Sequence, residues 1–193
     1  LQDISNDVTV IMTNDDASGQ KLTLELSGVD YSGIVEASRV TITIPQQTFV
    51  DLSDNNIVGG KTYDISASVS DDAGNEADVK SISFIMDKTK PIIDGIELEW
   101  GDYLNIAESD ASQNVTVRLA NDDASGQTLT LELSGVDYSG VVEMSRVTIE
   151  IPRQTFIDIS DSLTVRGREY DISASVSDAA GNAADVKLSL IHI

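Results

Sequence analysis

Acidic and amide side chains that could hold a metal ion lie in short polar loops of this sequence. The second half of the chain places Asp122 and Asp123 in one loop and Asp178 and Asn182 in another. Their oxygens suit a hard cation such as Ca²⁺, which takes 6–8 oxygen ligands from carboxylates, amides, backbone carbonyls and water. Carboxylates that lie close together repel one another, and a cation bound between them makes the electrostatic energy of the cluster favourable. The first half repeats the same candidates, as Asp15, Asp16, Asp71 and Asn75.

The net charge of −21, from 33 acidic and 12 basic residues, offers another explanation of these loops. A strongly acidic surface keeps a protein soluble without any bound metal. The stretch Asp178–Asn182 also has the composition of a tight turn, in which Gly and Asn accept a positive φ. The same charge repels nucleic acids and anionic membranes, so we exclude both as partners, and no insertion into a membrane is expected.

Nothing in the sequence predicts catalysis. The chain has no cysteine, and its one histidine, His192, is expected at the end of the last strand. The serines form no nucleophile elbow and no Ser/His/Asp set. We therefore predict that the protein is not an enzyme and has no catalytic residues.

The elements that must position the loops are β-strands. Runs such as Leu22–Leu26 and Val40–Ile44 alternate apolar and polar residues and are rich in Val, Ile and Thr, as half-buried strands are. Turn clusters, among them Tyr31–Gly33, separate the runs at short spacing. About seven short strands in about a hundred residues are typical of an immunoglobulin-like sandwich of two sheets with Greek-key connections. No stretch has a helical period, so the predicted fold class is all-β.

The order of these strands decides which loops meet. In such a sandwich the loop after the second strand and the loop before the last strand lie at the end where the chain enters. Residues 121–126, residues 178–182 and the entering linker should therefore converge. The predicted Ca²⁺ ligands there are Asp87, Asp122, Asp123, Asp178 and Asn182. The strands expected in the second half are Ile92–Leu98, Asn114–Ala120, Thr128–Ser134, Arg146–Ile151, Gln154–Ile159, Arg168–Ser177 and Ala183–Ile193.

The chain consists of one module used twice. Asn75 recurs as Asn182, 107 positions later (182 − 75), and no insertion interrupts the repeat. This predicts two tandem domains, residues 1–87 and residues 88–193. The first copy lacks a segment matching residues 87–107, so we expect it to lack its N-terminal strand and the chain to be a piece of a longer array. The linker before Pro91 is short and extended, which favours a semi-rigid joint.

Three other features have a structural and a functional interpretation. Tyr63 and Tyr170 occupy the position of a tyrosine corner, whose hydroxyl bonds back to the preceding connection, in preference to a binding aromatic. Trp100 is expected to cover the end of the sandwich in preference to stacking on a sugar. Residues 14–25 match part of an EF-hand loop, but their flanks are strands where that site needs helices, so we reject an EF-hand.

Several stretches together resemble a known family. These are the turn Val69–Asn75, the linker Asp87–Pro91 and the segment Asp102–Glu108. In order and spacing they are similar to the bacterial Ig-like repeats of giant secreted RTX-type or biofilm-associated adhesins, which carry a V-x-D-x-A-G-N turn and a D-x-T-x-P linker. The resemblance covers both copies.

The resemblance implies an extender: tandem modules outside the cell that project a ligand-binding tip from a bacterial surface in cell adhesion or biofilm formation. It implies Ca²⁺ at the joints, with Asp87, Asp178 and Asn182 as ligands, and with Asp71 and Asn75 serving the joint upstream. The expected partners are neighbouring identical repeats of the same chain, in a monomeric rod.

Two other functions stay open. The modules could themselves bind a glycan or a protein, or could accompany a secreted polysaccharide enzyme. The loops are almost identical in the two copies, whereas a loop that evolves a ligand site usually differs between neighbouring modules. The connection that differs most is Asp54–Gly59 against Asp161–Arg166, where a binding site unique to one module would be sought first.

Overall fold

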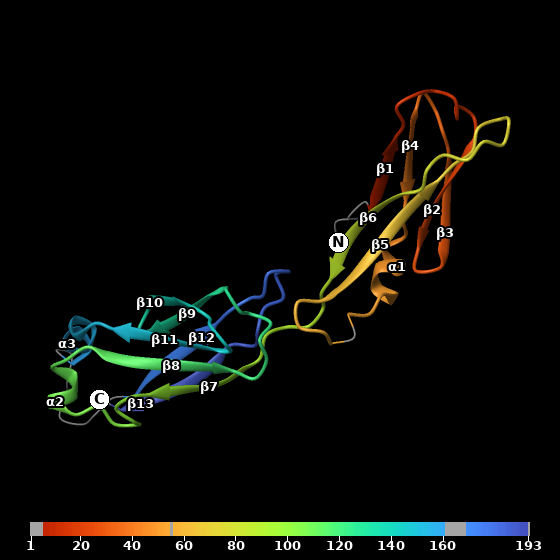
Figure 1. Cartoon of the computed structure of the whole chain (residues 1–193). Helices are drawn as coiled ribbons and strands as arrows, with labels where there is room; N and C mark the ends of the chain where they lie inside the picture. The colour runs from red at the N-terminus through yellow and green to blue at the C-terminus, as the bar shows by residue number, and fades with distance from the viewer. Residues whose placement is uncertain (1–5, 55, 161–168, 193) are drawn as a thin grey trace. The chain divides into compact units, whose positions relative to one another are not determined.

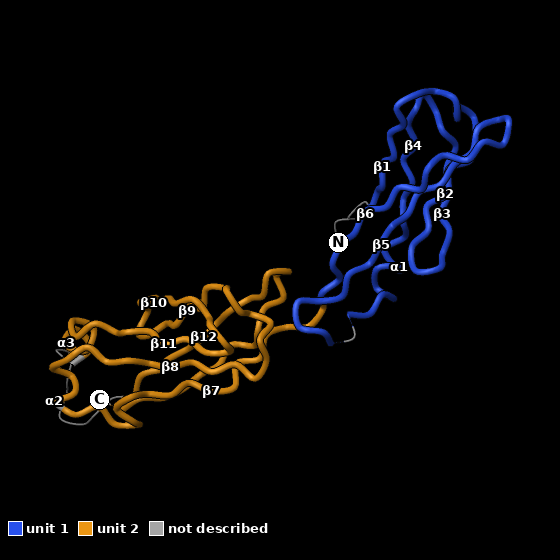
Figure 2. The backbone as a smooth tube through the Cα atoms, viewed as in Figure 1, with its two compact units in different colours: residues 1–87 blue, residues 88–193 orange. Residues whose placement is uncertain are grey.

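A computed structural model describes residues 6–54, 56–160 and 169–192. The chain divides into two units, residues 1–87 and residues 88–193 (Figure 2). Each unit is built from two antiparallel sheets, so the all-β prediction is confirmed. No helix of the described ranges is long and apolar enough to cross a bilayer.

Unit 2 contains a three-stranded and a four-stranded sheet (Figure 1). The strand order in the first is β11-β8-β7, and in the second it is β10-β9-β12-β13. The strands of the first sheet are β7 (Ile93–Leu98), β8 (Gln113–Leu119) and β11 (Arg146–Ile151). Those of the second are β9 (Thr128–Leu133), β10 (Val136–Val141), β12 (Glu169–Ser175) and β13 (Lys187–His192).

Unit 1 repeats this plan over its described residues, with two strands in the smaller sheet. Its four-stranded sheet has the order β3-β2-β5-β6. The strand β1 pairs with β4 alone in the other sheet, because the described part of unit 1 has no counterpart of β7. The strands are β1 (Asp7–Ile11), β2 (Lys21–Leu26), β3 (Val29–Ile34), β4 (Arg39–Thr43), β5 (Lys61–Ser68) and β6 (Lys80–Met86).

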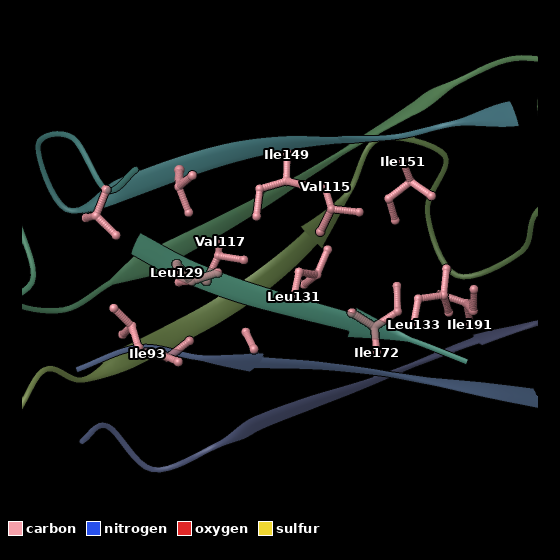
Figure 3. Packing of buried hydrophobic residues seen from close by; sticks show 14 of the residues in the cluster. Ile93, Val115, Val117, Leu129, Leu131, Leu133, Ile149, Ile151, Ile172 and Ile191 are labelled. Atoms are coloured by element: carbon pink, nitrogen blue, oxygen red, sulfur yellow. The ribbon is translucent and has the colours of Figure 1, made fainter. Parts of the chain in front are cut away.

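The alternating side chains of each strand fill the space between the two sheets. Figure 3 shows this core in unit 2, where Val117 and Ile149 of one sheet face Leu129 and Leu131 of the other. Ile93 of β7 joins the same cluster. Each fully buried aliphatic side chain stabilises the fold by about 1.5–3 kcal/mol.

The strands β3 and β10 were not predicted, because Tyr31–Gly33 has the composition of a turn. The turn predicted at Ser27 and Gly28 is present: both residues have positive φ and close a tight hairpin. Gly33 lies inside β3, and a Cβ there would come within 2.6 Å of the Val40 side chain. Glycine is thus required inside this strand for packing, not for turning.

The prediction of a strand at Gln154–Ile159 was wrong, since this segment is the helix α3 (Arg153–Ser160). Its counterpart in unit 1 is α1 (Gln46–Asp51), and a third short helix is α2 (Ile106–Ser109). Phe156 and Ile159 are both buried, and their spacing of three places them on one side of a helix but on opposite faces of a strand. As a result, Arg146–Ile151 is the strand that pairs with β8.

Both tyrosine corners are confirmed. The Tyr63 hydroxyl donates to the Ser53 backbone oxygen at 2.6 Å, and the Tyr170 hydroxyl donates to the Ile159 oxygen at 3.3 Å. Each bond ties the start of a strand to the connection before it. Trp100 is 9% exposed and packs edge-on against Phe156, so it covers the end of the core as expected.

Two predicted details fall outside the described residues. The connection 161–166 lies outside the described residues, and so do Arg168 and Ile193 at the ends of predicted strands. His192 ends β13, where its ring stacks on Tyr103 with 4.9 Å between ring centroids.

Candidate metal centre

The turn between β12 and β13 is organised by the carboxylate of Asp178. Its Oδ1 accepts the backbone N–H groups of Ala180 at 2.9 Å and Asn182 at 2.8 Å, and its Oδ2 accepts the Asn182 side-chain amide at 2.8 Å. Gly181 adopts φ 90°, a conformation that glycine tolerates best. The turn thus forms as its composition predicted, and it leaves Asp178 only 5% exposed.

The loop between β8 and β9 is tied to the entering chain by Asn121. Its side-chain oxygen accepts the Ile92 N–H at 3.0 Å, and its amide donates to the Lys90 carbonyl at 3.1 Å. The same amide donates to Oδ2 of Asp123 at 2.5 Å. Asp123 is 7% exposed, so a second carboxylate is buried at this end of the unit.

The chain entering unit 2 meets both loops. The Asn182 amide donates to the Thr89 carbonyl at 3.3 Å, and Lys90 forms an ion pair with Asp185 at 2.6 Å. Residues 89–92 therefore lie against the β8–β9 loop on one side and the β12–β13 turn on the other. The convergence of two loops and the entering segment, expected from topology, is present within unit 2.

Two of the predicted ligands serve other contacts. Oδ1 of Asp122 accepts the backbone N–H of Ser145 at 3.1 Å and its hydroxyl at 3.3 Å, which fixes the turn before β11. Asp15 makes the same pair of contacts to Ser38 in unit 1. Asp87 belongs to unit 1, where it follows β6 beside Gly60.

The first copy has the same turn in a more open setting. Asp71 accepts the backbone N–H groups of Ala73 and Asn75 and the Asn75 amide, with the geometry of the second copy. These hydrogen bonds lower the pKa of Asp71 below its ordinary value of 3.8, and the bond from the Asn75 amide has the largest effect. Asp71 is half-buried, and Asp16 is exposed. The two aspartates at these positions are thus buried in unit 2 and not in unit 1.

The donor set has the chemistry of a hard-cation site, with fewer carboxylates than predicted. No group of three or more His, Cys, Asp or Glu side chains among the described residues lies close enough to hold a metal. What unit 2 brings together are two buried carboxylates, Asp123 and Asp178, and the backbone carbonyls of Thr89 and Lys90. Each carboxylate oxygen has two acceptor positions, and the carbonyls are oxygen ligands of the kind that Ca²⁺ takes. The oxygen atoms of these residues are thus of the chemical types that bind Ca²⁺.

Sequence reasoning missed Asn121, which connects the β8–β9 loop to the linker. The signal was present, because Asn14 occupies the same place in the first copy, at the end of a strand. The EF-hand match was rightly rejected. Glu25 lies in the strand β2, where its carboxylate accepts the Gly28 N–H at 2.5 Å.

Comparisons with known proteins find this fold in two solved structures. No protein-family model matches the sequence, and no curated protein matches it. Among solved structures, a Ca²⁺-stabilized adhesin with which an Antarctic bacterium reaches out and binds ice is 21% identical, with a TM-score of 0.50, over 97% of this chain and 43% of that one. A structure of a 1.5-MDa bacterial ice-binding adhesin, concerned with host cell surface retention, is 20% identical, with a TM-score of 0.53, over 96% of this chain and 56% of that one.

The chain spans about half the length of these two adhesin structures. The similarity runs through both units of this chain, and at this level of identity it describes the fold. The chain therefore shares the β-sandwich fold of these two bacterial adhesins along nearly its whole length.

Proposed function

We propose that this chain is a non-enzymatic extender from a bacterial surface adhesin, located outside the cell. Ca²⁺ binds where the chain enters a repeat and stiffens the joint between successive repeats, so that a distal tip reaches its ligand. Its partners are the neighbouring repeats of the same chain. The observation that carries the proposal is the packing of residues 89–92 against both acidic loops of unit 2. The two similar adhesin structures support this context, and one of them is described as Ca²⁺-stabilized.

Burial of the two carboxylates explains why a cation would act there. Moving an ionised group away from water is costly unless it is paired, and Asp123 and Asp178 are 7% and 5% exposed. Hydrogen bonds from Asn121, Asn182 and backbone N–H groups offset part of that cost. A bound Ca²⁺ supplies the remaining positive charge and joins oxygens of the loops to those of the entering segment.

The test is thermal unfolding of the 193-residue chain in Ca²⁺ and in EDTA. Extracellular Ca²⁺ modules bind with Kd of about 10⁻⁴–10⁻³ M. At ten times Kd one site adds about 1.4 kcal/mol. A domain of about 100 residues gains roughly 4–8 °C in Tm for each kcal/mol, so we expect a rise of about 6–11 °C in unit 2.

Matched variants locate the site. Asp178→Asn and Asp123→Asn should abolish most of the Ca²⁺-dependent rise in Tm, because they remove the buried carboxylates. Asp71→Asn and Asp16→Asn change the same positions of unit 1 and should leave the rise in unit 2 unchanged. A Tm that does not respond to Ca²⁺ would contradict the proposal and would favour a module that itself binds a glycan or protein.

A further inference from the structure

A pocket recurs at the same place in both units. In unit 1 it lies between the hairpin of β2 and β3 and the helix α1 (Figure 1), and its volume is about 510 Å³. The hairpin contributes Val29 and Tyr31 to its wall, and α1 contributes Thr48 and Asp51. A pocket of this size is large enough to receive a long side chain of a partner.

Unit 2 has the equivalent pocket, also of about 510 Å³, between the hairpin of β9 and β10 and the helix α3. Val136, Tyr138, Thr155 and Asp158 line it, each 107 positions after its counterpart in unit 1. In both pockets the tyrosine and threonine hydroxyls are hydrogen-bonded at 2.6 Å. The described part of unit 1 has no counterpart of β7, so the pocket forms with or without that strand.

The wall of each pocket is apolar, with a carboxylate at its rim. Val29 and Val136 are each 48% exposed. The half-buried tyrosine that follows two positions later lies on the same face of the strand. Asp51 is exposed and follows Thr48 by three positions, which places both on one side of α1. The pocket thus combines a surface suited to methylene groups with a negative charge at its opening.

The carboxylate at the rim can accept further hydrogen bonds. Oδ1 of Asp51 accepts the Gln47 amide at 2.7 Å, and Oδ1 of Asp158 accepts the Gln154 amide at 2.7 Å. In the part of the chain that the structure describes, no donor reaches the second oxygen of either carboxylate, and no basic side chain lines either pocket. A ligand that donates hydrogen bonds and carries a positive charge would complement this rim.

The charge of the chain favours the same kind of ligand. With a net charge of −21, the protein attracts cations and repels anionic ligands. The pocket of unit 1 also includes the ring of Tyr63, and the ammonium group of Lys61 lies 4.7 Å from the centroid of that ring. A cation of the chain itself is therefore already placed against an aromatic side chain of this pocket.

We propose that this pocket, in each unit, binds an arginine side chain of a basic segment of another protein. The methylene groups of the arginine lie along the valine and the tyrosine, and the guanidinium group donates to the second oxygen of Asp51 or Asp158. Arginine suits the pocket because it joins an apolar stem to a planar group with five N–H donors. The interaction adds a partner that the role of an extender does not require.

A peptide of four arginines, blocked at both ends, tests the proposal with the 193-residue chain in EDTA. We expect saturable changes in the amide NMR signals of Val29, Tyr31 and Thr48 and of their counterparts in unit 2. The affinity should be in the millimolar range, because each pocket supplies one exposed ion pair and a small apolar contact. The same peptide with citrulline in place of arginine has the shape without the charge and should not saturate these signals.

Matched variants separate the pocket from the general attraction of an acidic protein. Asp51→Asn should weaken binding in unit 1 about threefold to fivefold, as expected for an exposed ion pair, and it keeps an oxygen for the Gln47 amide. Asp30→Asn makes the same change of charge at an exposed position on the other face of β3 and should leave the affinity unchanged. Asp158→Asn and Asp137→Asn are the corresponding pair in unit 2.

Three results would overturn the proposal. Equal binding of the citrulline peptide would show that the charge plays no part. Equal losses in Asp51→Asn and Asp30→Asn would show that the peptide responds to the total charge of the protein. Changes in the pocket signals with cellobiose, and none with the arginine peptide, would identify a sugar site. The pocket shares no residue with the proposed Ca²⁺ ligands and the measurement uses EDTA, so its failure is distinct from that of the proposed function.

Discussion

At the scale of single residues, one carboxylate organises the turn between the last two strands of each unit. Asp178 and Asp71 accept the same three donors, yet only Asp178 is buried. In unit 2 the turn also contacts the entering chain, because the Thr89 carbonyl accepts the Asn182 amide. The same local chemistry thus has two surroundings, which makes unit 1 an internal control for unit 2.

The open turn of unit 1 leads to a prediction about pH. The pKa of Asp71 is below 3.8 in the folded protein, mainly because the Asn75 amide bonds to its carboxylate. The ionised form is therefore favoured by folding, so its stabilising contribution is complete above about pH 3.8 and is lost as the pH falls through the lower, folded pKa.

The variant Asn75→Ala should raise the pKa of Asp71 toward 3.8, measured by NMR titration of the carboxyl carbon. Its cost in the free energy of unfolding should be largest near pH 7 and should shrink below the pKa of the free carboxyl. The same pKa for Asp71 in the variant and in the wild type would show that the amide bond does not set it.

At the scale of elements, tertiary packing gives two segments a secondary structure that their composition does not predict. The helix α3 places Phe156 and Ile159 on the core and brings Phe156 against Trp100, with 5.6 Å between ring centroids. The strand β3 tolerates Gly33 because the Val40 side chain fills the space beside it. Both outcomes depend on contacts between different elements, which the pattern of neighbouring residues within one segment does not contain.

The helix supports a prediction about stability. Phe156→Ala should lower the free energy of unfolding of unit 2 by about 3–5 kcal/mol, because it leaves a cavity under Trp100. Phe49→Ala is the matched change in α1, and it should cost clearly less, since Phe49 is only half-buried. Urea unfolding measures both variants. Equal costs would mean that the two helices contribute alike, contrary to the difference in burial.

At the scale of the whole molecule, the two units have unequal cores. Among the described residues, the core of unit 2 contains 21 buried hydrophobic residues and that of unit 1 contains nine. The strand β7 and Trp100 account for part of the difference, since they close the side and the end of unit 2. Unit 2 should therefore be the more stable of the two.

Calorimetry of the chain should show two transitions, with unit 1 unfolding at the lower temperature. A matched pair of core variants assigns them: Leu24→Ala and Leu131→Ala occupy the same position of the two copies and are 1% and 0% exposed. Each should cost about 2–5 kcal/mol, the first in the lower transition and the second in the upper one. A single transition shifted by both variants would show that the units unfold together.

The sequence by itself determined the features that depend on short-range pattern. The alternation of apolar and polar residues predicted strands such as Leu22–Leu26. The composition of Asp178–Asn182 predicted a tight turn, and the positions of Tyr63 and Tyr170 predicted the tyrosine corners. Each follows from backbone preferences or from a fixed place in the sandwich, which neighbouring residues reveal. The ligands proposed for Ca²⁺ stay a prediction.

Only the tertiary structure decided which of the repeated residues are buried. Asp123 and Asp16 lie in the same local sequence, Asn-Asp-Asp-Ala-Ser-Gly, yet one is 7% exposed and the other faces solvent. The physical reason is that burial is set by whatever lies on top of a loop, here the entering residues 89–92. Because that segment is about thirty positions away from the loop it covers, only the folded chain brings the two together.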